Sequence, residues 1–245
     1  MNQETTIQRF RFDDKTLDLH IIPERTFLPN QTTEIIYKAI KINPSETAIE
    51  LGSGIGPLSL LIALQPITHL YTVEIIQEQC ELARENVLKY GLEDKITILK
   101  GSLFEPLRNN FPEIKADFIV SDVSGITDIG YELGWYPKNI PTGGTDGIEL
   151  IIPLIKQAPY FLAQQNPNSR LYFPVATNFS DGDKILETAK KTFRKLEERA
   201  SRKIPLKAEQ LAIVDNSAYR PFAPIERKGS RGYWEIKVYE AREPI

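Results

Sequence analysis

A glycine-rich turn between two apolar segments constrains the fold of this chain more than any other sequence feature. Residues 47–51 form an apolar run that contains one acid, and Pro57 opens an apolar segment with helical spacing. The turn between them contains three glycines in five residues, namely Gly52, Gly54 and Gly56. Glycine adopts the positive φ that such a turn needs, and its missing Cβ lets a ligand lie against the N–H groups at the start of the helix. The sequence therefore predicts a strand, a ligand-binding turn and a helix.

The acid in this run, Glu50, indicates which ligand the turn binds. A dinucleotide fingerprint has the spacing Gly-x-Gly-x-x-Gly, whereas the third glycine here comes one residue early. A carboxylate beside the turn repels a pyrophosphate and attracts an ammonium or sulfonium group. The pattern resembles motif I of the class I S-adenosylmethionine-dependent methyltransferases. The resemblance implies S-adenosylmethionine as the cofactor, with Glu50 at its methionine end and the floor of the site formed by Gly52, Ser53, Gly54 and Gly56.

Strand and helix patterns alternate from residue 47 onward, which favours a parallel sheet with helices on both faces. The expected strands cover residues 47–51, 70–73, 96–99, 116–120, 170–173, 199–204 and 233–239, and the expected helices cover 57–64, 78–90, 148–162 and 181–193. We therefore predict an α/β, Rossmann-like fold of the class I methyltransferase type, with a mostly parallel seven-stranded sheet. Residues 46–245 would form the cofactor-binding domain. Residues 1–45 would form an extension on the substrate side, with a β-hairpin over 6–12 and 16–22 and a helix that starts near residue 30.

Two further segments are expected on the cofactor side. Glu74 ends the second strand, 22 residues after Gly52, where an acid accepts hydrogen bonds from ribose hydroxyls. Ser102 and Leu103 follow the third strand, where methyltransferases usually keep an acid for the adenine amino group. Ser102 departs from that pattern, so this contact comes either from its hydroxyl or from the backbone.

Asp122, at the end of the fourth strand, is the candidate catalytic residue. Ligands of open α/β sheets bind outside the carboxyl ends of the strands, so Asp122 is expected beside the transferable methyl group and the cofactor. Its carboxylate can accept hydrogen bonds from a nitrogen acceptor or take a proton from a hydroxyl. The alternative is that Asp122 only caps the following turn.

The segment from Asp122 to Gly147 is a long loop, and loops of more than ~15 residues in a compact domain are usually functional. Aromatic rings in it can exclude water and contact a cation through their faces, or they can anchor the loop to the core. The residues predicted to bind the substrate are Phe27, Ser121, Tyr131, Trp135, Tyr136 and Gly144.

Residues 23–162 resemble the bacterial protein-glutamine methyltransferases that modify release factors and a ribosomal protein. Residues 26–34 are similar to the Pro-Arg-Pro-Glu-Thr-Glu segment of that family, and residues 143–149 are similar to its Gly-Gly-x-Asp-Gly-Leu segment. The family's Asn-Pro-Pro-Tyr is absent, and Ser121-Asp122-Val123-Ser124 stands in its place. Because Asn-Pro-Pro-Tyr holds the acceptor amide in that family, its absence disfavours glutamine as the acceptor.

A second, local resemblance concerns the same residues. Ser121-Asp122-x-x-Gly125 is similar to the Ser-Glu-x-x-Gly start of the double-carboxylate loop in protein arginine methyltransferases. The resemblance implies a second catalytic carboxylate from Glu132 or Asp128. Two carboxylates in one pocket can grip a guanidinium through paired charge-assisted hydrogen bonds.

Composition excludes several other classes of protein. The net charge of −3 disfavours nucleic acid as a partner, although residues 184–231 carry thirteen Lys or Arg against six Asp or Glu. This basic excess either faces an acidic partner or is a solvated surface. One cysteine, Cys80, and two distant histidines, His20 and His69, predict no metal site. No apolar run approaches the ~20 residues of a membrane span, so we expect a cytoplasmic protein.

These patterns together predict an S-adenosylmethionine-dependent methyltransferase. The expected reaction is N-methylation of a peptide or protein side chain, or of a small amine or guanidine. The alternatives are an O-methyltransferase for a small metabolite and a protein that binds the cofactor without catalysis. The glycine spacing disfavours a nicotinamide oxidoreductase. The sequence does not predict the oligomeric state.

Overall fold

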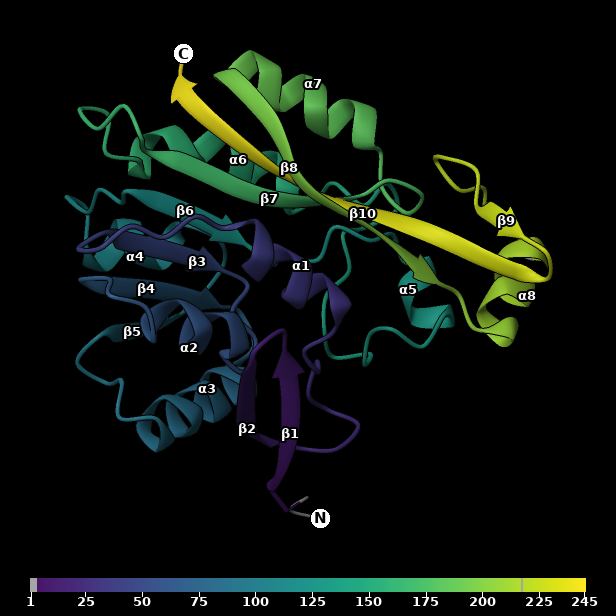
Figure 1. Ribbon diagram of the computed structural model, residues 1–245, viewed down its shortest axis with the longest axis horizontal. Coiled ribbons are helices and arrows are strands. Elements are labelled where there is room, and N and C mark those ends of the chain that lie inside the picture. The colour runs from purple at the N-terminus through teal and green to yellow at the C-terminus, as the bar shows by residue number, and fades with distance from the viewer. Residues whose placement is uncertain (1–3, 217) are drawn as a thin grey trace.

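The computed structural model describes residues 4–216 and 218–245 and is built around one mixed sheet (Figure 1). The strands of this sheet are β3 (Thr47–Leu51), β4 (His69–Glu74), β5 (Ile96–Lys100), β6 (Phe118–Ser121), β7 (Arg170–Ala176), β8 (Phe193–Pro205), β9 (Glu226–Lys228) and β10 (Arg231–Pro244). Their order is β5-β4-β3-β6-β7-β10-β8, and β9 pairs with β10. The first five strands in this order are parallel, and β10 is antiparallel to its neighbours β7, β8 and β9. The predicted mostly parallel α/β sheet is confirmed, but in the described residues it has eight strands in place of the predicted seven.

Helices cover both faces of the sheet, as predicted (Figure 1). One face carries α1 (Gln31–Ala39), α2 (Pro57–Ala63) and α3 (Gln77–Lys89), and the other carries α4 (Glu105–Asn110), α6 (Ile151–Phe161) and α7 (Gly182–Thr192). Successive strand side chains point to opposite faces. Ala48 accordingly packs in the first apolar cluster, whereas Ile49 packs in the second. Burial on both faces explains why the central strands read as apolar runs.

The N-terminal hairpin consists of β1 (Thr6–Phe12) and β2 (Lys15–Ile21) and packs on α3. The Asp18 N–H donates to the Tyr90 hydroxyl at 2.8 Å, and the His20 N–H donates to Asn86 Oδ1 at 2.6 Å. Leu17 and Leu19 of β2 are buried in the core. The hairpin is therefore part of the packed structure, whereas the segment that follows it, residues 24–32, reaches the pocket described below.

Several elements differ from the sequence-based expectation. The short helices α4, α5 (Ile129–Glu132) and α8 (Ala208–Asn216) and the short strand β9 were not predicted, and β8 and β10 extend well beyond the expected strands. Helices of four to nine residues give too little periodicity to be recognised. The edge strand β8 is largely exposed, so charged side chains hide its pattern. Helix α6 begins at Ile151 instead of 148, with Pro153 in its first turn, where proline is tolerated.

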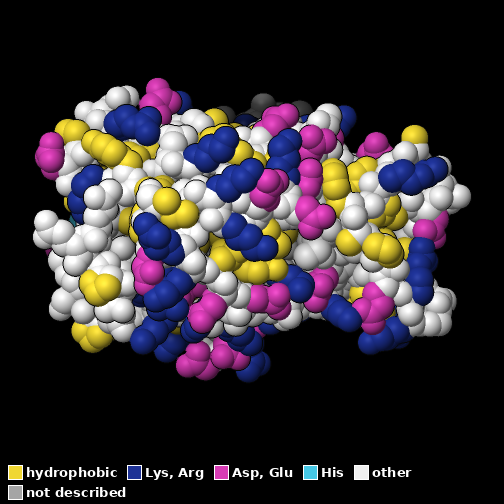
Figure 2. All heavy atoms as spheres, turned by 90° about the horizontal axis from the view of Figure 1, so that it is seen from above, with side chains coloured by type: hydrophobic (Ala, Val, Ile, Leu, Met, Phe, Trp, Pro, Cys, Tyr) yellow, Lys and Arg dark blue, Asp and Glu magenta, His cyan; other side chains and the backbone are white. Residues whose placement is uncertain are grey.

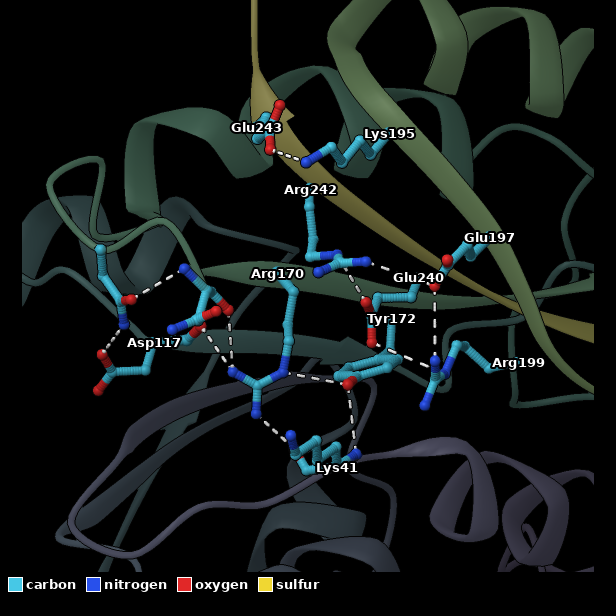
Figure 3. A network of polar contacts seen from close by, with 12 residues as sticks. Lys41, Asp117, Arg170, Tyr172, Lys195, Glu197, Arg199, Glu240, Arg242 and Glu243 are labelled. Carbon is cyan, nitrogen blue, oxygen red and sulfur yellow. Dashed lines mark hydrogen bonds and ion pairs between the residues drawn. The ribbon is translucent and has the colours of Figure 1, made fainter.

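A polar network around Arg170 and Tyr172 lies at the amino end of the parallel strands (Figure 3). Arg170, the first residue of β7, forms two hydrogen bonds of 2.9 Å with the carboxylate of Glu46, which directly precedes β3. The Arg170 Nε donates to the Tyr172 hydroxyl at 3.0 Å. This bidentate pair fixes the starts of two central strands, at the sheet edge opposite their carboxyl ends.

The basic excess of residues 184–231 is largely paired with acids. Arg202 contacts Glu34 at 2.7 Å, and Lys203 and Arg227 form ion pairs with Glu226 and Asp215. Figure 2 shows Lys and Arg side chains interspersed with Asp and Glu over the upper face. The structure therefore favours a solvated, mixed-charge surface over a basic surface for an acidic partner. Within the described ranges, no helix is both long and apolar enough to cross a membrane.

Candidate functional site

A pocket of about 590 Å³ lies along the carboxyl edge of the sheet. Parallel strands β3 to β7 all end at this edge. The antiparallel register pairs Ile236 with Ala176 and Trp234 with Ile204, which brings residues of β10 and β8 to the same edge. The pocket therefore spans almost the whole width of the sheet.

The pocket has two halves that differ in chemistry. The glycine half, over β3, β4 and β5, is lined by Gly52, Gly54, Glu74, Gly101, Ser102 and Leu103. The aromatic half, over β7, β10 and β8 and beneath the long loop, is lined by Trp135, Tyr136, Ile204, Pro205, Trp234 and Ile236. Asp122 follows β6, between the two halves, and also lines the pocket.

The glycine turn has the open cradle that a ligand requires. All three glycines have positive φ, and the Gly54 N–H donates to Glu74 Oε2 at 2.8 Å. A Cβ on Gly52 would lie 2.9 Å from the Val123 backbone, so the chain has no room for a side chain there. A Cβ on Gly54 would have no atom within 4 Å, because it would point into open space. The turn is thus tight on its inner side and free on the side of the pocket.

Glu74 is held rigidly at the wall of the glycine half. Its Oε1 accepts from the Ile76 N–H and its Oε2 accepts from the Gly54 N–H, both at 2.8 Å. Burial raises the pKa of this carboxyl group, and hydrogen bonds from the backbone of Ile76, Gly54 and Ile75 oppose that shift. The remaining lone pairs of the carboxylate can still accept hydrogen bonds from ligand hydroxyls.

Glu50 lies outside the pocket lining. It is fully buried and accepts a hydrogen bond from Ser59 through Oε2, and its Oε1 has no hydrogen-bond partner among the described residues. Burial raises the pKa of Glu50 to about 8, and the nearby charges of Asp122 and Glu74 act in the same direction. The predicted cofactor residues Ser53 and Gly56 also lie outside the lining. Direct contact of these three residues with a cofactor stays a prediction.

Asp122 is fixed through its backbone and through one carboxylate oxygen. Its N–H donates to the Leu51 carbonyl of β3 at 3.0 Å, and its Oδ2 accepts from the Thr33 hydroxyl of α1 at 3.1 Å. Burial raises the pKa of Asp122 to about 7, and the Thr33 hydrogen bond opposes this rise. Thr33 was not among the predicted site residues, because only the packing of α1 against the sheet brings it to Asp122.

Two loops meet over the pocket through aromatic contacts. Phe27 and Tyr136, both pocket-lining, stack with their ring centroids 5.2 Å apart and their planes 11° apart. The Asn139 side chain donates to the Arg25 carbonyl at 3.4 Å, which joins the same two loops. Trp135 packs on Trp234 at 5.2 Å, so β10 supports the long loop from below.

Some predicted site residues are not brought into the pocket lining. Glu132 is exposed on α5, and the Ser121 side chain is fully buried. The Tyr131 hydroxyl donates to the Ile140 carbonyl at 2.7 Å, which anchors the long loop. Gly144 also lies outside the lining, and its φ of 78° belongs to a turn. Three pocket residues were not predicted from the sequence, namely Ser124, Ile204 and Trp234. Ser124 could have been predicted because it closely follows the end of β6, whereas Ile204 and Trp234 lie within strands.

The charged residues in the pocket lining are all acidic. They are Glu24, Glu74 and Asp122, and the lining contains no Lys, Arg or His among the described residues. Such a pocket attracts a cationic ligand and repels phosphates. No group of three His, Cys, Asp or Glu residues that could hold a metal ion occurs in the part of the chain that the structure describes.

Solved structures share this architecture. The ribosomal protein L11 methylase from Lactobacillus delbrueckii has a TM-score of 0.54 at 17% identity, over 90% of this chain and 83% of that one. The tRNA m1G37 methyltransferase from M. jannaschii has a TM-score of 0.58 at 13% identity, over 99% of this chain and 58% of that one. The chain has the class I methyltransferase fold. Identities this low show the fold alone, and the same fold is seen in P. horikoshii TYW2, solved in complex with MeSAdo, with a TM-score of 0.55 at 15% identity, over 98% of this chain and 72% of that one.

Sequence comparisons point to the same class I group. Residues 26–108 match the family model described as histone methylation protein DOT1. The ribosomal protein uL3 glutamine methyltransferase of Bordetella pertussis is 31% identical over 124 residues, which cover 48% of this chain and 40% of the relative. The release factor glutamine methyltransferase of Moorella thermoacetica is 27% identical over 144 residues, which cover 55% and 49%. The chain thus spans less than half the length of these relatives, and the resemblance to glutamine methyltransferases seen in its motifs is confirmed.

Proposed function

We propose that this protein is an S-adenosylmethionine-dependent methyltransferase that acts on a nitrogen atom. The observation that carries the proposal is a pocket whose charged lining residues, within the described chain, are all acidic. This pocket adjoins a glycine turn that leaves open space at Gly54. S-adenosylmethionine, when bound, supplies a methyl group on a cationic sulfur, and an acidic pocket suits that charge. Two relatives of this chain are named as glutamine methyltransferases, which supports methyl transfer to a nitrogen atom.

The residues of the glycine half fit the parts of this cofactor. The free lone pairs of Glu74 would accept from the ribose hydroxyls, and Ser102 with Leu103 would border the adenine. Gly52 and Gly54 would form the floor, with Glu50, Ser53 and Gly56 shaping the turn. A 2′-phosphate does not fit, because the described lining offers no cationic side chain.

Asp122 is the proposed catalytic residue, since it lies between the glycine half and the aromatic half. It would orient the acceptor nitrogen, while Phe27, Trp135 and Tyr136 exclude water. The acceptor is a protein side chain or a small amine or guanidine. The relatives' names specify protein glutamine, and this chain has Ser121-Asp122-Val123-Ser124 where those enzymes carry Asn-Pro-Pro-Tyr. We place the reaction in the cytoplasm, without nucleic acid as a partner.

Isothermal titration calorimetry with S-adenosylhomocysteine and with NAD tests the cofactor assignment. We expect micromolar binding of S-adenosylhomocysteine and no binding of NAD, because the acidic lining repels a pyrophosphate. Tight binding of NAD without binding of S-adenosylhomocysteine would refute the proposal and favour an oxidoreductase. Transfer of labelled methyl to an acceptor would then separate a catalyst from a protein that only binds the cofactor.

A further inference from the structure

We propose that the methyl acceptor is an amine nitrogen carried on an apolar body, held at Asp122 with its body in the aromatic half of the pocket. This inference rests on the proposed methyltransferase function and narrows its substrate. It follows from three features of the pocket: the charge of Asp122, the hydrogen bonds of its two carboxylate oxygens, and the apolar side chains that line the aromatic half.

Among the described residues, the side chains that β8 and β10 contribute to the pocket lining are uncharged, and Asp122 lies at the border of this aromatic half. Trp135, Ile204, Pro205, Trp234 and Ile236 line it. A carboxylate beside such a wall has little water to solvate it, so a cationic partner offsets its desolvation better than a neutral one. A neutral amide such as that of glutamine would leave this charge uncompensated.

The hydrogen bonds of Asp122 favour an ammonium over a guanidinium. Oδ2 already accepts from Thr33, and among the described residues no donor reaches Oδ1. A guanidinium binds best when both oxygens of a carboxylate are free to accept its fork of N–H groups. An ammonium needs only one oxygen for a strong contact. Neither candidate for the second carboxylate of a guanidinium site, Glu132 or Asp128, lines the pocket, and both residues are exposed.

A second polar group stands two residues further along the chain. Ser124 lines the pocket, and its buried hydroxyl lies beside the Tyr136 hydroxyl, where it opposes the rise in the pKa of Tyr136 that burial causes. A hydroxyl oxygen has two lone pairs, so Ser124 Oγ has capacity to accept a hydrogen bond from a ligand. An amine has more than one N–H, so it can donate to Asp122 Oδ1 and to Ser124 Oγ together.

The reaction is balanced with Asp122 as the proton acceptor. The bound ammonium gives one proton to Asp122 Oδ1 and becomes a neutral amine. Its lone pair forms the new N–C bond to the methyl carbon, while the C–S bond breaks and its electron pair stays on sulfur. The product is an N-methylammonium ion, and Asp122 returns its proton to solvent. The pKa of Asp122, raised to about 7 by burial, makes it a better base than an exposed aspartate.

The test compares ligands of one skeleton by calorimetry on the full chain saturated with S-adenosylhomocysteine. The probes are 2-phenylethylamine, phenylacetamide, 2-phenylethanol and 2-phenylethylguanidine. We expect the amine to bind at least ten-fold more tightly than each of the others. A lysine side chain also carries an amine on an apolar body. A parallel titration with N-acetyllysine amide therefore shows whether the pocket prefers the lysine of a protein or a free arylalkylamine. Tighter binding by either amine supports the proposal.

Variants connect the selectivity to Asp122. Asp122→Asn is expected to abolish the preference for 2-phenylethylamine while S-adenosylhomocysteine still binds. Glu149→Gln removes the same charge from an exposed residue outside the pocket lining and should leave the preference intact. Equal or tighter binding of the amide, the alcohol or the guanidine to the wild type would overturn the inference. If the wild type did not bind S-adenosylhomocysteine at all, this result would instead refute the proposed methyltransferase function itself.

Discussion

Glu74 ends β4 and Asp122 follows β6, so both carboxyl groups lie at the carboxyl edge of the sheet, where they give the pocket its acidic character. Strand ends are visible in the sequence, and the carboxyl ends of such strands meet at one edge of the sheet. Thr33 was not predictable, since its contact with Asp122 joins residues 89 positions apart in the chain. The same limit applies to Ser59, which satisfies one oxygen of the buried Glu50.

The Thr33 hydroxyl is expected to lower the pKa of Asp122. A hydrogen bond to the ionised form of an acid stabilises that form, so Thr33→Val should raise the Asp122 pKa by about one unit. Thr33→Ser should keep the wild-type value. Titration of the Asp122 carboxyl carbon by NMR measures both. An unchanged pKa in Thr33→Val would show that the contact has no effect on the charge of Asp122.

Glu50 should make the ligand-free protein less stable as the pH rises. Its pKa is about 8 in the folded protein and near 4.5 when unfolded, so the folded state binds more protons between these values. Stability is therefore lost as the pH rises through this window. Glu50→Gln should gain on the order of 2 kcal/mol over the wild type at pH 8.5 and little at pH 4.5. Urea unfolding at both pH values checks this, and a gain of equal size at both would contradict it.

At the scale of helices and strands, periodicity and the Gly and Pro signals defined the elements of the glycine half well. The predicted strand over residues 47–51 and the helix that starts at Pro57 match β3 and α2. The C-terminal third was less predictable, because β8 is an exposed edge strand rich in charge and α8 has only nine residues. Its packing depends on partners that are distant in sequence.

The glycine turn allows a matched pair of substitutions. Gly52→Ala should destabilise the fold by roughly 3 kcal/mol, because its Cβ would lie 2.9 Å from the Val123 backbone at a positive φ. Gly54→Ala should cost about 1 kcal/mol for its positive φ alone, since its Cβ meets open space. That methyl group occupies the ligand side, so binding of S-adenosylhomocysteine should weaken at least ten-fold. Denaturant unfolding and calorimetry separate the two effects, and equal stability losses would contradict the geometry.

At the scale of the whole molecule, the two ends of the parallel strands have different roles. Contacts at their amino ends stabilise the fold, and the pocket at their carboxyl ends is the proposed ligand site. The Arg170–Glu46 network lies at the amino edge, and the acidic pocket lies at the carboxyl edge. The class of fold followed from the alternating elements. The aromatic half did not, because Trp234 and Ile204 reach the pocket only through the antiparallel register of β10 with β8.

Disruption of the amino edge should change stability without changing ligand binding. Arg170→Met leaves the buried carboxylate of Glu46 without its partner, which costs roughly 3–5 kcal/mol. The double variant Arg170→Met with Glu46→Gln should recover much of this loss, because the unpaired charge is removed. Urea unfolding measures both, and affinity for S-adenosylhomocysteine should stay within about two-fold of the wild type. A large loss of affinity in Arg170→Met would contradict the separation of the two edges.

The central claim is that the glycine half of the pocket binds S-adenosylmethionine through Glu74. Calorimetric titration of S-adenosylhomocysteine into the wild type, Glu74→Gln and Glu81→Gln tests it most directly. Glu81 is an exposed acid on α3 outside the pocket lining, so its substitution controls for charge alone. We expect tight binding to the wild type and Glu81→Gln, and a loss of about ten-fold, or about 1.4 kcal/mol, in Glu74→Gln. Absence of binding to the folded wild type, or equal affinity in all three proteins, would contradict the account.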